Sequence, residues 1–244
     1  MKYNRILMIR EHFRLHQTIA TIVARSQEHM EIAKSAIIDS RIQLEEFIAS
    51  DPIFQLTLEP YDRPVDDAPA VVKRMCHASS LFHVGPMAAV AGAIAASAVE
   101  AMVEAGADYA VVDNGGDIAI CSDEPVLVGI YAGASPIKDL ALEIHPAGGI
   151  LGVCSSSGTV GPSISFGCAD VATVISRDPA IADAGATALG NAVAPDISLE
   201  DCFSAVDRTG VIAALVIRGD EMAVWGDAPP IRRARVGYDL ITKG

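Results

Sequence analysis

The stretch DYAVVDNGGDIAIC, residues 108–121, predicts two β-strands joined by a tight turn. Residues 108–113 and 118–121 have the apolar, β-branched character of strands, and Asn-Gly is a strong hairpin signal. Two adjacent glycines also let a ligand or a second backbone approach within contact distance. The residues Asn114, Gly115, Gly116 and Asp117 are therefore either a tight turn alone or a turn that also binds a ligand.

Further strands are predicted outward from this hairpin in both directions. Residues 8–16 alternate between a basic and a mostly apolar face, and residues 18–23 can pair with them as a hairpin. Later strands are expected over residues 125–131, 149–153 and 169–176, and a terminal hairpin over 211–218 and 222–225. Adjacent strand pairs recur instead of regular strand–helix–strand units, so the predicted fold class is α+β with mixed antiparallel sheets.

Helices are expected over residues 26–50, 70–79, 85–105, 178–192 and 198–208. The third is rich in alanine, and its residues 87–103 are apolar enough to raise the question of a membrane span. Because Glu100 lies inside it and its length is at the short limit for a span, a buried helix of a globular fold is the better interpretation. We predict a single domain over residues 1–244, in which Met1–Pro69 supplies strands and a long helix and Ala70–Gly244 carries the motifs.

Composition excludes several classes of protein. The 244 residues contain 18 Lys and Arg against 31 Asp and Glu, a net charge of −13, which argues against nucleic-acid binding and a polybasic membrane surface. Five cysteines without a C-x-x-C pair indicate neither a disulfide framework nor a structural zinc site. With no signal peptide in the first residues, we expect a cytoplasmic protein. The high apolar content, 51%, favours a homo-oligomer.

A loop rich in serine and glycine, CSSSGTVGPSISFG, spans residues 154–167. Successive backbone N–H groups and hydroxyls in such a loop can bind an anion, which makes Ser155, Ser156, Ser157 and Gly158 candidate ligand-binding residues. The loop matches neither a Walker A sequence nor a G-x-S-x-G nucleophile elbow. A surface loop without a ligand is the alternative.

The sequence DAGAT at residues 183–187 places Asp183 and Thr187 on one face of a predicted helix. Carboxylate and hydroxyl oxygens are hard ligands that suit Mg²⁺, which commonly takes its remaining ligands from water and phosphate. An exposed polar helix face is the competing interpretation.

The order of these segments resembles the ApbE-like flavin transferases: NGGD, a Ser/Gly loop, a strand ending in VIS, then D-A-x-A-T on a helix. The runs 85–92 and 152–191 look closer to an uncharacterised branch beside the transferases. The resemblance implies an ApbE-like fold, FAD or FMN as ligand, and Mg²⁺ held by Asp183 and Thr187. It also implies FMN transfer from FAD or FAD hydrolysis as the activity.

Two departures from the family pattern bear on activity. The NGGD segment lacks one residue between Asn and the glycines, and the family's His-Ile-x-Asp-Pro-x-Thr-Gly segment is replaced by GPSISFGCAD, residues 161–170. Because no histidine follows His145, a base in this segment cannot be a histidine, and Asp170 is the candidate catalytic base. A structural role in the turn that enters the next strand is the favoured alternative for Asp170. A small-molecule-binding protein without catalysis is one alternative function. A serine hydrolase is another, with a serine of residues 155–165 and His145 as base.

Overall fold

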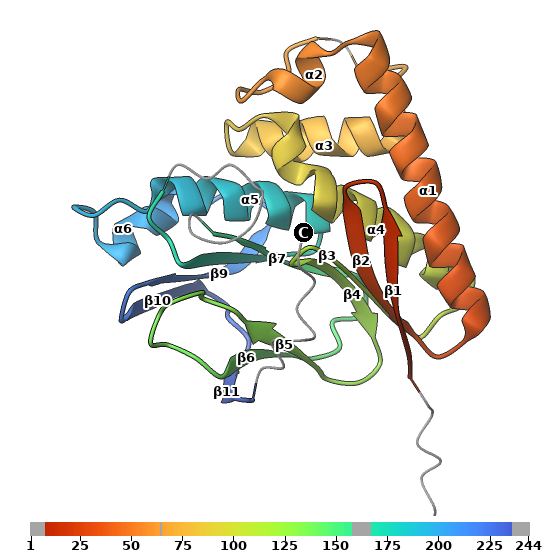
Figure 1. Ribbon diagram of the computed structural model, residues 1–244. Coiled ribbons are helices and arrows are strands. Elements are labelled where there is room, and N and C mark those ends of the chain that lie inside the picture. Colours follow the sequence, from red (N-terminus) through yellow and green to blue (C-terminus); the bar gives the residue numbers. More distant parts are fainter. Residues whose placement is uncertain (1–7, 64, 158–166, 236–244) are drawn as a thin grey trace, which may run out of the picture.

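The computed structural model describes residues 8–63, 65–157 and 167–235, and its strands form two antiparallel sheets (Figure 1). The larger sheet has the order β1-β2-β3-β4-β7-β8-β9-β10, and the smaller has the order β11-β6-β5. The strands of the larger sheet are β1 (Ile9–Leu15), β2 (Thr18–Ala24), β3 (Tyr109–Asn114), β4 (Asp117–Ser122), β7 (Leu151–Ser156), β8 (Val171–Ser176), β9 (Val211–Arg218) and β10 (Glu221–Gly226). Those of the smaller are β5 (Val126–Ile130), β6 (Leu140–Ile144) and β11 (Ile231–Arg233).

The helices cover one face of the larger sheet, and the smaller sheet lies on the other face (Figure 1). They are α1 (Gln27–Ser50), α2 (Ile53–Leu56), α3 (Ala70–Leu81), α4 (Val90–Glu104), α5 (Pro179–Ala192) and α6 (Leu199–Cys202). Two short 3-10 helices, η1 (Pro86–Ala89) and η2 (Phe203–Ala205), precede α4 and follow α6. The fold class is therefore α+β, as the sequence predicts.

Each face of the larger sheet packs against its own hydrophobic core. Alternate residues of a strand point to opposite faces, so Ala20 and Ile22 of β2 join the helix-side core while Val23 points to the other side. The second core fills the space between the two sheets and contains Val128, Leu142 and Leu215, one from each of three strands. Apolar residues on both faces explain why β8 is buried along its whole length.

The alanine-rich helix α4 is the centre of the helix layer. It contacts α1, α5, β3 and β4, and most of its residues are buried. Within the described residues, Pro86–Glu104 is the one helical segment long and apolar enough to cross a membrane, and 56% of its apolar window is buried inside the fold. Small side chains here let neighbouring helices approach closely, so this segment serves as a core helix.

Several helix ends follow the local signals of the sequence. The hydroxyl of Ser26 accepts the N–H of His29 and begins α1, although no acidic residue completes a capping box. Asp178 accepts the N–H of Ala180 and begins α5, with Pro179 in the first helical position. Gly106, with φ of 91°, ends the helix of α4.

Two predicted helices differ from those in the structure, and two strands were not predicted. The first turn of the alanine-rich helix is the 3-10 helix η1, and the helix expected over residues 198–208 is only α6 followed by η2. Burial of Cys202, Phe203 and Val206 in the core fixes the path of the second segment, so tertiary packing overrides helix propensity. Strands β6 and β11 were not predicted, because they are short and depend on pairing with each other.

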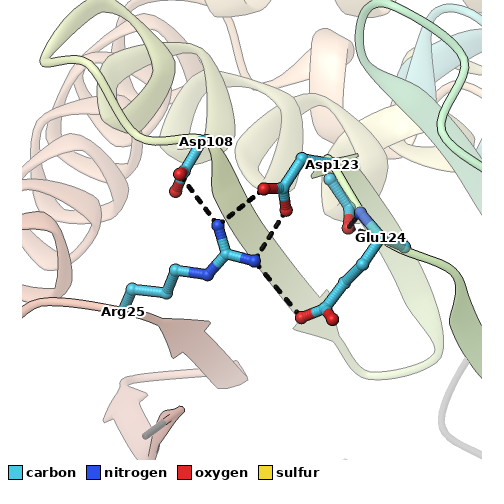
Figure 2. Close-up of polar contacts among 5 residues, drawn as sticks. Arg25, Asp108, Asp123 and Glu124 are labelled. Atoms are coloured by element: carbon cyan, nitrogen blue, oxygen red, sulfur yellow. Dashed lines mark hydrogen bonds and ion pairs between the residues drawn. The ribbon is translucent and has the colours of Figure 1, made fainter. Parts of the chain in front are cut away.

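An arginine joins the start of the fold to its middle (Figure 2). Arg25, which follows β2, makes a bidentate pair with Asp123 at 2.7 and 2.9 Å and contacts Asp108 at 2.8 Å and Glu124 at 3.3 Å. Its guanidinium also lies 5.3 Å from the ring centre of Tyr109. These contacts hold the carboxyl end of β2 against both ends of the β3–β4 hairpin.

Candidate functional site

A cavity of about 1840 Å³ borders both cores of the protein. One lobe is lined by helix-side residues, namely Leu44, Ile48, Val84, Met87, Val90 and Ile94. The other lobe is lined by residues that face the smaller sheet, among them Val23, Tyr109, Val111, Ile118, Val126 and Val128. The β3–β4 turn, residues 114–117, lines the cavity as well, and it joins two central strands of the larger sheet.

The β3–β4 turn has the geometry that its two glycines allow. Asn114 pairs with Asp117, so Gly115 and Gly116 are the central residues, with φ of 72° and 102°. The carboxylate of Asp113 accepts the N–H of Gly116 at 2.8 Å, and the amide of Asn114 donates to the carbonyl of Ala91 at 3.2 Å. The turn is therefore fixed to the first turn of α4 and lines the cavity in a defined conformation.

Asp183 lies at the N-terminus of α4 and is not among the residues that line the cavity. Only 8% of the surface of Asp183 is exposed, and its Oδ2 accepts a hydrogen bond from the N–H of Gly92 at 2.8 Å. Burial raises the pKa of Asp183 to about 7, although the N–H groups of Gly92 and Ala91 act in the opposite direction. The competing interpretation, an exposed polar helix face, does not hold for Asp183, because α4 packs directly over it.

The approach of α4 to α5 depends on a glycine. A Cβ on Gly92 would lie 2.3 Å from the carbonyl oxygen of Pro179 and 2.8 Å from the Cβ of Asp183. Gly152 of β7 is packed as tightly from the sheet side, since a Cβ there would lie 2.4 Å from the Cα of Pro179. No side chain fits at either position, so both glycines allow the N-terminus of α5 to reach the site.

Asp117 begins β4 and pairs with Cys154 of β7. Burial raises its pKa well above the usual range, and the carboxylates of Asp183 and Asp113 add to this effect. The N–H of Ser155 and the thiol of Cys154 favour the charged form, but Oδ1 of Asp117 is buried without a hydrogen-bond partner in the described part of the chain. A buried carboxylate oxygen left without a partner is costly unless a proton or a cation meets it.

These residues fit a divalent cation. Two carboxylates, Asp117 and Asp183, interact from different elements of the fold, and Thr187 lines the cavity one helical turn beyond Asp183. Within residues 8–63, 65–157 and 167–235 no three His, Cys, Asp or Glu side chains are grouped as a metal site. A cation held here would therefore use hydroxyl, water or ligand oxygens beside the carboxylates, as Mg²⁺ commonly does.

The serine segment is part strand and part loop. Residues 154–156, expected in a loop, are the last residues of β7, and the hydroxyl of Ser155 lies 2.8 Å from that of Thr173 on β8. Ser155, Ser156 and Ser157 all line the cavity, as the prediction of a ligand-binding role requires. The prediction for Gly158 lies outside the described residues.

Asp170 is placed elsewhere by the fold. Its Oδ2 accepts the N–H of Gly219 at 2.7 Å, in the turn between β9 and β10, and its own N–H donates to Ile217. The described cavity lining does not include it. This contact gives Asp170 a structural role, in which its carboxylate fixes the β9–β10 turn.

Sequence reasoning missed three features of the site. The sequence patterns single out neither Gly92 nor Cys154, and they give no indication of the helix-side lobe. The DAGAT motif could have suggested that a second element packs over Asp183, because small residues flank it. The lobe itself is formed by α1, η1 and α4, which no motif links in the sequence.

Comparison with known proteins places this arrangement in a family. A family model described as "AbpE bacteria" matches residues 6–217. A UPF0280 protein of Methanothrix thermoacetophila is 88% identical over 97% of this chain and all of its own length. A UPF0280 protein of Methanosarcina barkeri is 56% identical over 96% of this chain and 93% of its own length.

Solved structures show the same fold at low sequence identity. The apo flavinyl transferase ApbE of Pseudomonas stutzeri is similar with a TM-score of 0.57 and 12% identity, over 100% of this chain and 99% of that one. The ApbE protein of Thermotoga maritima is similar with a TM-score of 0.53 and 14% identity, over 98% and 100%. Such identities establish the fold alone. The chain has the ApbE fold and belongs to the family described as AbpE bacteria, within the group named UPF0280 proteins.

Proposed function

We propose that this protein binds FAD, or a closely related phosphate-bearing dinucleotide, together with Mg²⁺. The observation that carries the proposal is the position of Asp117 and Thr187 on a cavity with one lobe on each side of the larger sheet. A dinucleotide has two bulky halves joined by a pyrophosphate. The two lobes would take the halves, and the β3–β4 turn would face the pyrophosphate.

Asp183 and Thr187 would hold the cation, and backbone and hydroxyl groups of residues 155–157 would bind phosphate oxygens. When bound, Mg²⁺ neutralises charge on a pyrophosphate and polarises it. The N–H groups of Gly92 and Ala91 keep the Asp183 carboxylate in place, so its orientation does not depend on the ligand. Tyr109 and Tyr131 are the aromatic residues that the described lining offers to a flavin ring.

FMN transfer from FAD, or FAD hydrolysis, is the reaction that we infer from family membership. The names of the structural neighbours, flavinyl transferase and flavin transferase, apply to those proteins. A non-catalytic flavin-binding protein is the second candidate, because no histidine follows His145 in this sequence. The single-domain organisation, a homo-oligomeric state and a cytoplasmic location stay predictions from the sequence.

The test measures the binding of FAD to the purified protein by fluorescence quenching, once in the presence of Mg²⁺ and once in EDTA. We expect binding that requires Mg²⁺ and that is lost in Asp183→Lys. Because Asp183 is buried, Thr187→Val provides a second variant that preserves shape and removes one oxygen ligand. Both variants must retain the circular dichroism spectrum of the wild type.

Chromatography of the bound mixture separates the two candidate functions. Release of FMN and AMP, or appearance of protein-bound FMN on an added acceptor, indicates an enzyme. FAD that is bound with Mg²⁺ and recovered intact indicates a binding protein. Absence of FAD binding under both conditions would refute the proposed function.

A further inference from the structure

The unpartnered oxygen of Asp117 is not explained by the residues around it. Oδ1 is buried and accepts no hydrogen bond from the residues that the structure describes, whereas the N–H of Ser155 and the thiol of Cys154 act on the same carboxylate. Cys154 itself is fully buried and also contacts the carbonyl of Pro179 at 3.4 Å. The sheet thus holds Asp117 on one side, and no group of residues 8–63, 65–157 and 167–235 meets its Oδ1.

The surroundings of Asp117 are negative. The groups that act on it by charge are the carboxylates of Asp183 and Asp113, and Asp113 belongs to the adjacent strand. Asp183 is fixed by N–H groups of α4 and cannot turn away from Asp117 without losing the bond to Gly92. The backbone therefore holds two buried carboxylates against their mutual repulsion, which a cation between them would reverse.

We propose that Asp117 is a second carboxylate ligand of the divalent cation, acting through Oδ1, and that the cation binds before any nucleotide does. The inference rests on the proposed function for the use of Mg²⁺ at this site. It goes beyond that function because the resemblance to the transferases gives the metal to Asp183 and Thr187 and gives Asp117 no part in it. Two carboxylates on a rigid frame would bind the ion without the charge of a pyrophosphate.

A proton shared between the two carboxylates is the alternative way to relieve the repulsion. The two explanations differ in what Asp117→Asn does. If the site serves a cation, the substitution removes a ligand and weakens metal binding. If the site holds only a shared proton, the substitution leaves metal binding unchanged.

The experiment measures Mn²⁺ binding to nucleotide-free protein by the loss of the free Mn²⁺ signal in electron paramagnetic resonance. We expect the wild type to bind one Mn²⁺ per chain and Mg²⁺ to displace it. Asp117→Asn should weaken the affinity at least about tenfold, since it removes one charged ligand. Glu221→Gln, which removes an equal charge from an exposed residue outside the cavity lining, is the matched control and should stay within about twofold of the wild type.

Thermal unfolding supplies a readout that is independent of the metal assay. In EDTA, Asp117→Asn should melt at the wild-type temperature or above it, because one repelling charge is gone. Saturating Mg²⁺ should raise the melting temperature of the wild type and have a much smaller effect on the variant. A Mg²⁺-induced rise that is equal in both proteins would overturn the proposal.

Two other results would overturn it as well. One is that the wild-type protein binds no Mn²⁺ in the absence of nucleotide. This result would refute the proposal even if the Asp117→Asn variant fails to fold. The other is unchanged Mn²⁺ affinity in Asp117→Asn. Failure of the proposed function looks different: the wild type would bind Mn²⁺ through Asp117 and still show no affinity for FAD.

Discussion

The substitution Gly92→Ala tests the packing that fixes the site. The new Cβ would lie 2.3 Å from the carbonyl oxygen of Pro179, about 1 Å closer than an ordinary contact. The obstacle is backbone, so α4 and α5 must separate for the methyl group to fit. Overpacking of this kind costs about 1–3 kcal/mol, and the strained or lost hydrogen bond to the Asp183 carboxylate adds about 1.5–3 kcal/mol.

We therefore expect Gly92→Ala to lower the free energy of unfolding by about 3–6 kcal/mol, a large part of the 5–15 kcal/mol typical of a protein. The measurement is urea denaturation followed by circular dichroism, in EDTA and in Mg²⁺. The matched control is Gly149→Ala, because the nearest atom to a Cβ at that position is Nη1 of Arg177, 4.0 Å away. We expect that control to change stability by less than about 1 kcal/mol.

A second readout connects the packing to the site. Separation of α4 from α5 withdraws the N–H of Gly92 from Asp183, and loss of that bond raises the pKa of Asp183 further. The Mg²⁺-induced rise in melting temperature should fall in Gly92→Ala and persist in Gly149→Ala. Wild-type stability together with a wild-type response to Mg²⁺ in Gly92→Ala would refute the account of α4 as the support of Asp183.

Two further predictions concern charge. Because the pKa of Asp183 is raised to about 7 from the ordinary 3.8, its stabilising contribution is full below about pH 4 and is lost as the pH rises through 7. In EDTA, the free energy of unfolding of the wild type relative to Asp183→Asn should therefore be about 2.5 kcal/mol greater at pH 5 than at pH 8. Urea denaturation at each pH measures this difference. A difference between the two proteins that is the same at both pH values would contradict the prediction. Arg25→Gln should destabilise the protein by about 1–2 kcal/mol at low salt and by less in about 0.5 M NaCl, whereas Arg232→Gln, which removes an exposed pair with Glu143, should cost less than about 0.5 kcal/mol. Equal effects of the two arginine substitutions on chemical denaturation would show that Arg25 is an ordinary surface charge.

The local signals of the sequence account for a large part of the fold. Alternation over residues 8–16 predicted the first strand of the β1–β2 hairpin, and two strand-like segments around Gly219 predicted the β9–β10 hairpin. The two glycines of NGGD predicted the turn between β3 and β4. Ser26, Asp178 and Gly106 mark helix ends through bonds and backbone angles that depend on neighbouring residues only. Signals of this kind are readable because their partners are a few positions away in the chain.

The features of the predicted site also fall into two groups: those that local patterns indicate and those that depend on long-range packing. Period and spacing put Asp183 and Thr187 on one helix face, and the order of motifs gave the family. Whether that face is exposed depends on α4, which is about ninety positions earlier and packs over Asp183 through Gly92. Asp170 was assigned to the site by elimination, and the fold instead bonds it to Gly219 across the β9–β10 turn.

The sequence by itself determined the α+β class, the strand pairs closed by short turns, several helix ends and the residue types of the proposed cation site. Only the tertiary structure decided that Asp117 and Asp183 interact, that Cys154 and Ser155 hold one side of Asp117, and that the cavity has a lobe on each face of the sheet. The physical reason is the distance along the sequence between the residues that interact. Turns, caps and periodic faces are fixed by bonds over a few residues, whereas burial and carboxylate repulsion arise between segments that meet only when the sheet and the helix layer are assembled.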